Sequence, residues 1–144
     1  MKEKIIRQSE GKQLNVLGDN QIVKLSGQDT NGQFALILQD NPPNASIPKH
    51  IHTNEDELFS ILEGEVEFEV GEHKTVLKSG DIIFLPRNIP HSFKVIGTQN
   101  AKITAIVTPA GLENMFEELS QLPSGPPDFS KVAQICGNYG LSFI

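Results

Sequence analysis

Two of the four histidines in the chain, His50 and His52, stand one residue apart in the stretch P-K-H-I-H-T-N-E-D-E. In an extended strand, residues two positions apart point to the same side, so both imidazoles are expected to face one point. Glu57 follows after four intervening residues and opens the apolar run E-L-F-S-I-L, from which a neighbouring strand can direct its carboxylate to that point. Imidazoles and a carboxylate that converge in this way are typical ligands of a divalent transition metal.

A third imidazole comes from His91 in the run G-D-I-I-F-L-P-R-N-I-P-H-S-F. Pro86 and Pro90 restrict the backbone on either side of a short turn, and Asn88 tolerates the left-handed conformation. His91 is therefore expected at the start of a strand, in a rigid frame. Three neutral imidazoles and one carboxylate would bind one divalent ion, and iron, manganese, nickel, cobalt, copper and zinc all remain open.

The same residues admit other interpretations. The histidines could be ordinary buried polar residues or a relic site, but a buried cluster without a cation leaves polar groups in need of partners, which favours a metal. Glu57 could form a simple salt bridge, act as a ligand, or act as a base beside the metal. We expect Glu55 and Asp56 to form a solvated loop, and Arg87 to be a turn or interface residue. His73, in the turn G-E-H-K, is left out of the site.

The elements that must position these residues are predicted to be strands. From about residue 13 to 108 the pattern consists of short apolar or alternating runs separated by turn residues, with no helical period, which predicts an all-β sandwich or barrel. The turns fall at Glu63-Gly64, Gly71-Glu72 and Ser79-Gly80. The predicted strands are Gln13 to Leu17, Gln21 to Leu25, Phe34 to Leu38, Ser46 to His52, Glu57 to Leu62, Glu65 to Val70, Lys74 to Leu77, Asp81 to Leu85, His91 to Ile96 and Lys102 to Val107.

One of these strands, E-V-E-F-E-V from Glu65 to Val70, alternates without exception. Its valines and phenylalanine should face the core, and its three glutamates should form a solvated outer face that discourages edge pairing rather than a cation site.

After Pro109 the pattern becomes helical. Leu112, Met115, Phe116 and Leu119 share one helical face, and a second short helix is expected from Phe129 to Tyr139, with Phe129, Val132 and Ile135 on one face. We therefore expect one domain of residues 1–144, with a barrel core at about 13–108 and a helical tail at about 110–144. The tail is expected to act as a lid or brace on the β body and to be available for a dimer contact.

Composition removes several classes of function. The chain has 144 residues, a net charge of -6 and a single cysteine, so it offers neither a basic surface for nucleic acid nor an internal disulfide. No apolar run approaches the roughly 20 residues that span a bilayer. The N-terminal stretch M-K-E-K-I-I-R-Q has no apolar core of the kind found in signal peptides, so a cytoplasmic protein is expected.

The motifs resemble those of the cupin superfamily. H-I-H-T-N-E-D-E-L-F-S-I-L-E-G is similar to the first cupin motif, and G-D-I-I-F-L-P-R-N-I-P-H is similar to the second, with Asn88 where the family usually has glycine and Val95 where it often has asparagine. The resemblance implies a jelly-roll β-barrel, a homodimer, and metal ligands at His50, His52, Glu57 and His91. The segments L-P-R-N-I-P-H-S-F, around His91, and T-P-A-G-L-E-N-M-F-E-E-L also resemble small bacterial cupins of the quercetin-dioxygenase-like type.

From these observations we expect a mononuclear metal dioxygenase that acts on a small aromatic or enolic molecule, with Glu57 as ligand or base. Phe59, Ile61 and Phe84 are expected to line the barrel and exclude water. Two alternatives stay open: a non-redox metal isomerase or lyase, and a barrel that binds a small ligand without catalysis. Patterns for serine hydrolases, Walker A nucleotide hydrolases and nicotinamide enzymes are missing from the chain.

Overall fold

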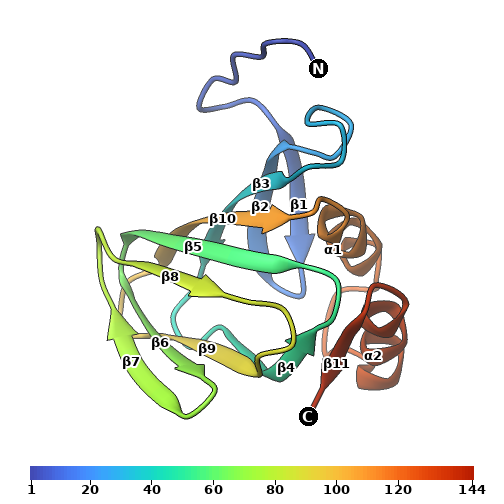
Figure 1. The fold of residues 1–144 in the computed structure, drawn as a ribbon. Coiled ribbons are helices and arrows are strands. Elements are labelled where there is room, and N and C mark those ends of the chain that lie inside the picture. Colours follow the sequence, from blue (N-terminus) through green and yellow to red (C-terminus); the bar gives the residue numbers. More distant parts are fainter.

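Two antiparallel sheets face each other in the computed structural model, which describes residues 1–144 (Figure 1). Two helices and a last short strand follow the barrel strands. The elements are β1 (Lys12–Val16), β2 (Asp19–Leu25), β3 (Ala35–Asn41), β4 (Ser46–His52), β5 (Asp56–Glu63), β6 (Glu65–Val70), β7 (His73–Leu77), β8 (Ile82–Leu85), β9 (His91–Ile96), β10 (Ala101–Thr108), α1 (Leu112–Ser120), α2 (Phe129–Asn138) and β11 (Leu141–Phe143).

The strand order is that of a jelly roll. One sheet has six strands in the order β1-β2-β3-β10-β5-β8, and the other has five in the order β11-β4-β9-β6-β7. From β3 to β10 the chain repeatedly crosses between the sheets, so strands distant in sequence become neighbours. The predicted all-β barrel with a helical tail is confirmed, and three of the ten predicted strands, β4, β6 and β9, have the expected bounds.

The inward residues follow the two-residue period of a strand. On β6, Val66 and Phe68 are fully buried between the sheets. The glutamates of β6 lie on the other face, where Lys74 Nζ is 3.0 Å from an Oε of Glu67. These glutamates therefore form the predicted outer face, and lysines balance their charge.

Three phenylalanines join the two sheets. Phe59 comes from β5 in the six-stranded sheet, whereas Phe68 and Phe93 come from the five-stranded sheet, and their ring centroids lie 5.7 to 6.2 Å apart. Rings at this spacing and tilt pack favourably, and burial of each contributes roughly 2 to 3 kcal/mol. This cluster fixes the separation of the sheets beside the candidate site.

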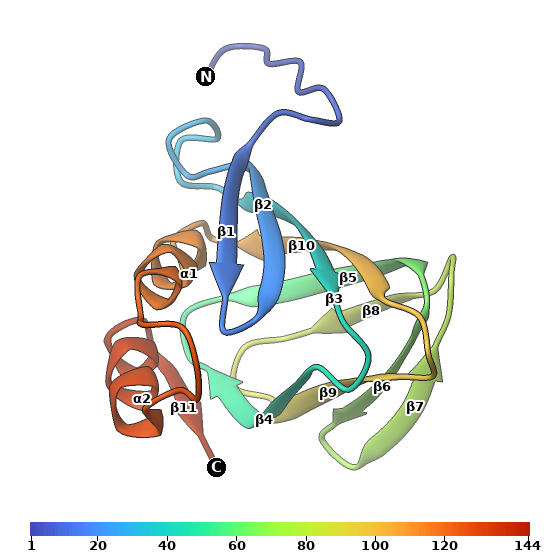
Figure 2. The same cartoon turned by 180° about the vertical axis from the view of Figure 1, so that it is seen from behind.

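The two helices lie side by side at one end of the barrel (Figures 1 and 2). The four apolar residues predicted to share one face of α1 are all buried. The carboxylate of Asp128 caps α2 by accepting hydrogen bonds from the backbone N–H groups of Ser130 and Lys131. Neither helix combines the length and the apolar character that crossing a membrane requires.

The predicted face of α2 is partly wrong. Val132 is buried and Ile135 is partly buried, but Phe129 is 69% exposed. Cys136, which was not predicted on this face, is more deeply buried than Ile135. Phe129 is the first residue of the helix, about one turn before its first buried residue, Val132. The helix therefore packs through its middle and C-terminal part.

Strand β11 was not predicted. It has three residues and pairs with the edge of β4, where Leu141 lies opposite His52 and Phe143 lies opposite His50. A three-residue run is too short to show a period, so nothing in the local sequence distinguishes it from a loop. Its position means that the C-terminus braces the strand that carries two of the candidate ligands.

The predicted turns use residues that accept a positive φ. Gly64 has φ +82° between β5 and β6, Gly71 has φ +57° between β6 and β7, and Asn88 has φ +65° in the turn before β9. At Gly64 an added Cβ would lie 2.6 Å from the carbonyl oxygen of Asn100, whereas at Gly71 the nearest atom, on Ile89, is 4.0 Å away.

These two glycines give a matched test of the fold. Both alanine variants incur the left-handed backbone cost of about 1 to 2 kcal/mol, but only Gly64→Ala adds a clash with backbone atoms. We expect Gly64→Ala to lower the free energy of unfolding by at least about 1 kcal/mol more than Gly71→Ala in urea titrations. Equal losses would show that the turn relaxes and that the close approach does not matter.

Candidate metal centre

Strands from both sheets bring the four predicted ligands together. His50 and His52 lie on β4, and His91 begins the adjacent strand β9, directly opposite His50. Glu57 lies near the start of β5, in the facing sheet. All four side chains are buried, and one potential ligand atom from each lies within 4.8 Å of the others.

Backbone carbonyls orient two of the rings. The Nδ1 of His50 donates to the carbonyl oxygen of Pro48 at 2.8 Å, and the Nδ1 of His91 donates to that of Ile89 at 3.0 Å. A carbonyl can only accept, so these contacts place the proton on Nδ1 and leave each Nε2 lone pair free. The Nε2 of His91 faces Glu57, at 3.2 Å from its Oε2. This is the tautomer that a metal-binding histidine needs.

The third ring, His52, lies between two carboxylates. Its Nε2 is 3.4 Å from Oε2 of Glu57, and its Nδ1 is 3.5 Å from Oε2 of Glu55. The prediction that Glu55 belongs to a solvated loop is wrong, because its side chain is buried and only 5% of the residue is exposed. A run of acids after a strand is typical of a solvent-exposed loop. The local sequence does not show that Nδ1 of His52 faces Glu55.

The charges of the group are coupled. Burial, with added repulsion from His91, lowers the pKa of His50 to about 4. Burial would raise the pKa of Glu57, but the close approach of His91 and the positive potential of the histidines outweigh it, so this pKa lies below its usual value. Burial would likewise lower the pKa of His52, yet Glu55 and Glu57 together raise it. At neutral pH the group therefore combines a neutral His50 and an ionised Glu57, and His52 keeps its proton to a higher pH than an ordinary imidazole does.

This arrangement fits a single metal ion. Ligands that share an ion with bonds of about 2.1 Å lie roughly 3 to 4 Å apart, and the four donor atoms, which lie within 4.8 Å of one another, would need to contract only slightly around an ion. The Nε2 of His91 is also buried without a hydrogen-bond partner, a costly state that a cation would relieve. Three nitrogens and one oxygen suit iron, manganese, nickel, cobalt, copper or zinc, so the donor set does not select one of them.

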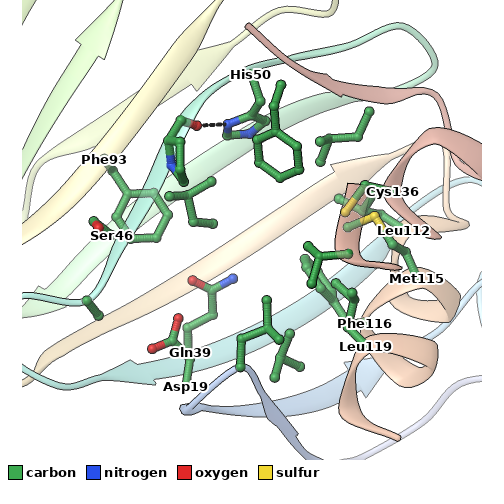
Figure 3. A pocket seen from close by; sticks show the side chains of 18 of the residues that line it. Asp19, Gln39, Ser46, His50, Phe93, Leu112, Met115, Phe116, Leu119 and Cys136 are labelled. Atoms are coloured by element: carbon green, nitrogen blue, oxygen red, sulfur yellow. Dashed lines mark hydrogen bonds between the residues drawn. The ribbon is translucent and has the colours of Figure 1, made fainter. Parts of the chain in front are cut away.

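A cavity of about 300 Å³ adjoins the ligands (Figure 3). Its lining is mainly apolar and comes from both sheets, both helices and β11. Phe93 lies on the sheet side, and Met115 and Phe116 reach into it from α1. The helical tail thus closes one side of the cavity, as expected of a lid or brace.

Only one of the three predicted lining residues borders the cavity. Phe59 does, whereas Ile61, on the same strand, is buried in the core away from it. Phe84 is 57% exposed, because β8 directs Ile83 and Leu85 inward and Phe84 outward. Every residue of β8 is apolar, so its sequence does not reveal which alternate residues face the core.

An ion pair holds the loop before β9 against β5. Arg87 donates from Nε at 3.1 Å and from a terminal nitrogen at 2.8 Å to the two carboxylate oxygens of Asp56. These contacts lower the pKa of Asp56 to about 2. Asp56 therefore begins a strand instead of lying in a free loop, and Arg87 is a turn residue beside the centre, as expected.

Comparison with known proteins identifies the family. A family model described as a cupin domain matches residues 37–107, the segment that contains all four candidate ligands. The chain is a small protein of the cupin superfamily.

Individual relatives are distant. Quercetin 2,3-dioxygenase from Bacillus subtilis strain 168 is 27% identical over 92 residues, or 64% of this chain, and an uncharacterised HTH-type transcriptional regulator from Haemophilus influenzae is 35% identical over 83 residues, or 57%. The matches cover only 27% and 26% of those longer proteins. The structure of KdgF from Halomonas sp. superposes with a TM-score of 0.68 at 15% identity, over 77% of this cupin and 99% of that chain, and so shares the fold.

The contact between Glu55 and His52 leads to a prediction. A carboxylate on the outer nitrogen of a ligating histidine makes the ring a better donor, and its loss typically costs 10- to 100-fold in metal affinity. We expect Glu55→Gln to weaken metal binding by about that factor, measured by competition with a chelating dye. Glu63→Gln, an exposed change on the same strand as Glu57, should leave the affinity unchanged. Equal affinities of both variants would remove Glu55 from the centre.

The raised pKa of His52 leads to a second prediction. A metal must displace the proton that His52 favours, whereas His50 is already neutral above about pH 4. Metal affinity should therefore rise with pH between about pH 6 and pH 8, and the number of protons released per ion should fall toward zero as His52 loses its proton. Calorimetry in buffers of different ionisation enthalpy measures this number. A value of zero throughout that range would contradict the protonated state assigned to His52.

Proposed function

We propose that this cupin is a mononuclear metal-dependent dioxygenase acting on a small aromatic or enolic molecule. The observation that carries the proposal is the position of the candidate centre: four buried candidate ligands, two of them histidines oriented by backbone carbonyls, face an apolar cavity large enough for a small organic molecule. Four protein ligands leave one or two positions on a transition metal, which is the arrangement that binding of substrate and oxygen requires.

A relative supports this class of reaction. The matched part of the Bacillus subtilis protein, named quercetin 2,3-dioxygenase, corresponds to 64% of this chain. The chain spans about a quarter of that protein, so the activity is carried over as a proposal. When bound, a redox-active metal would relay electrons from the substrate to oxygen and act as a Lewis acid.

The residues of the chain have distinct roles in this proposal. His50, His52 and His91 hold the ion, and the carbonyls behind His50 and His91 fix their rings. Glu57 is either a fourth ligand or the base that accepts a proton from a substrate hydroxyl. Its pKa lies below the usual value, so it is ionised and able to accept at neutral pH, and an acidic enol or phenol is the donor that matches it best.

The cavity walls have a separate role. Phe59, Phe93 and Phe116 line the cavity with apolar surface, which displaces water from around the substrate. Exclusion of water strengthens the electrostatic contacts at the centre and protects reactive species from hydrolysis. The aromatic rings also offer flat surfaces against which an aromatic substrate can stack.

Metal analysis is the first test. Untagged protein purified without chelators should contain close to one equivalent of iron, manganese, nickel, cobalt or copper, and His50→Ala and His91→Ala should lose it. His73→Ala is the matched control, because His73 is exposed and lies outside the group. A wild-type protein that holds no metal and takes none up on reconstitution would refute the oxygenase and favour the ligand-binding barrel.

Oxygen uptake then separates the remaining functions. The metal-loaded protein should consume oxygen when flavonols or other enolic aromatics are added, and His50→Ala should abolish this uptake. Zinc as the only metal, or turnover of a carbonyl substrate without oxygen, would indicate a non-redox isomerase or lyase. Ligand binding without turnover would indicate a binding module, a role compatible with the match to the Haemophilus influenzae regulator.

A further inference from the structure

One part of the cavity wall is polar and takes no part in the candidate metal centre. Asp19 and Gln21 lie at alternate positions of β2, and Gln39 lies on β3, directly opposite Gln21. All three line the cavity. Further along the same inward faces the residues are apolar, with Val23 opposite Ile37. Gln21 and Gln39 thus border the cavity, whereas the other buried polar residue on this face of β3, Asn41, lies outside its lining.

These side chains have few partners within the protein. Gln21 and Gln39 are only 5% and 6% exposed, and the Oε1 of Gln21 is buried without a hydrogen-bond partner. The Oε1 of Gln39 accepts one long hydrogen bond, of 3.3 Å, from Asn41. Burial raises the pKa of Asp19 to about 6, and no cation compensates its charge. Buried polar groups without partners are costly, so a purely structural role does not explain them.

The polar residues lie across the cavity from the histidines. His50, His52 and His91 belong to the five-stranded sheet, whereas β2 and β3 belong to the six-stranded sheet. Figure 3 places Asp19 and Gln39 together, on the side of the cavity away from His50. The cavity is therefore polar at two separated places and apolar between them.

We propose that Asp19, Gln21 and Gln39 form a second binding subsite, here called the distal anchor, which holds a hydroxyl-bearing end of the substrate while the other end reaches the metal centre. This inference rests on the proposed function and adds a substrate class to it: elongated aromatic or enolic molecules that carry a hydroxyl group at the far end. The distal anchor selects among substrates and takes no part in the chemistry.

The donor and acceptor types of the distal anchor favour a hydroxyl group. A carboxylate accepts hydrogen bonds, and a glutamine amide both donates and accepts them. A hydroxyl group does both, so it can satisfy Gln21 and Asp19 together. An anionic group would be repelled by Asp19, and an ammonium group, which can only donate, would leave the amide N–H groups of both glutamines without an acceptor.

Two flavonols that differ in a single group test the distal anchor. The probes are 3-hydroxyflavone and 3,4′-dihydroxyflavone, which share the metal-binding end and differ by one hydroxyl at the far end. Fluorescence titration of metal-loaded protein without oxygen measures binding in the absence of turnover. We expect the wild type to bind the dihydroxy compound about tenfold more tightly, the effect of one buried hydrogen bond.

Variants assign this preference to the proposed residues. Gln21→Leu and Asp19→Asn should each remove most of the tenfold preference while leaving the affinity for 3-hydroxyflavone within about threefold. Gln13→Leu is the matched control for Gln21→Leu, because Gln13 is exposed on the adjacent strand β1, and it should retain the preference. A preference that is absent from the wild type, or retained in Gln21→Leu, would overturn the distal anchor.

A second pair of probes separates the distal anchor from the proposed function. 4-Phenylphenol and biphenyl have no chelating end, and titration of the metal-free protein with them prevents the phenol from binding the metal. If neither flavonol binds but 4-phenylphenol is preferred and Gln21→Leu removes that preference, the dioxygenase proposal fails and the distal anchor stands. If neither pair shows a preference that depends on Gln21, the distal anchor is refuted.

Discussion

The contact of Glu57 with His52 and His91 of the opposite sheet, beside His50, is the constraint on which the rest of the structure depends. It places a carboxylate and several imidazoles in a buried space, where a charge without a partner costs several kcal/mol. The group is stable only if a proton or a cation balances the carboxylates, and the pKa directions of Glu57 and His52 show that balance. Because the contact joins the sheets, any slip of β4 or β5 by one residue would direct its ligands away from the centre.

Most of this constraint is visible in the local sequence. His50 and His52 share a side because strands have a period of two. Asn88 adopts the left-handed turn because an asparagine side chain tolerates that conformation. The buried face of α1 follows from helical spacing in the same way. The convergence of β4, β5 and β9 is not local: the residue types and the strand period suggested it, and the resemblance to cupin motifs implied the same four ligands. The family model confirms the superfamily.

The features that the sequence did not reveal depend on contacts between distant segments. Glu55 resembles a solvated acid until His52 is placed beside it, and β11 becomes a strand only because the edge of β4 is available. Phe84 was assigned to the cavity because an entirely apolar strand does not show which residues face inward. Gln21 and Gln39 become neighbours through the pairing of β2 with β3, which a reading of either strand alone does not predict.

The two polar regions of the cavity share one energetic explanation, because each contains buried polar groups that lack partners in the free protein. A fold selected only for stability would place apolar residues at positions 19, 21 and 39, as it does one pair further along the same strands, where Val23 faces Ile37. Positions that break the local pattern and leave buried groups without partners are expected where function compensates the cost. A ligand that spans the cavity would complete both regions at once, so the stability that each loses in the free protein would be recovered on binding.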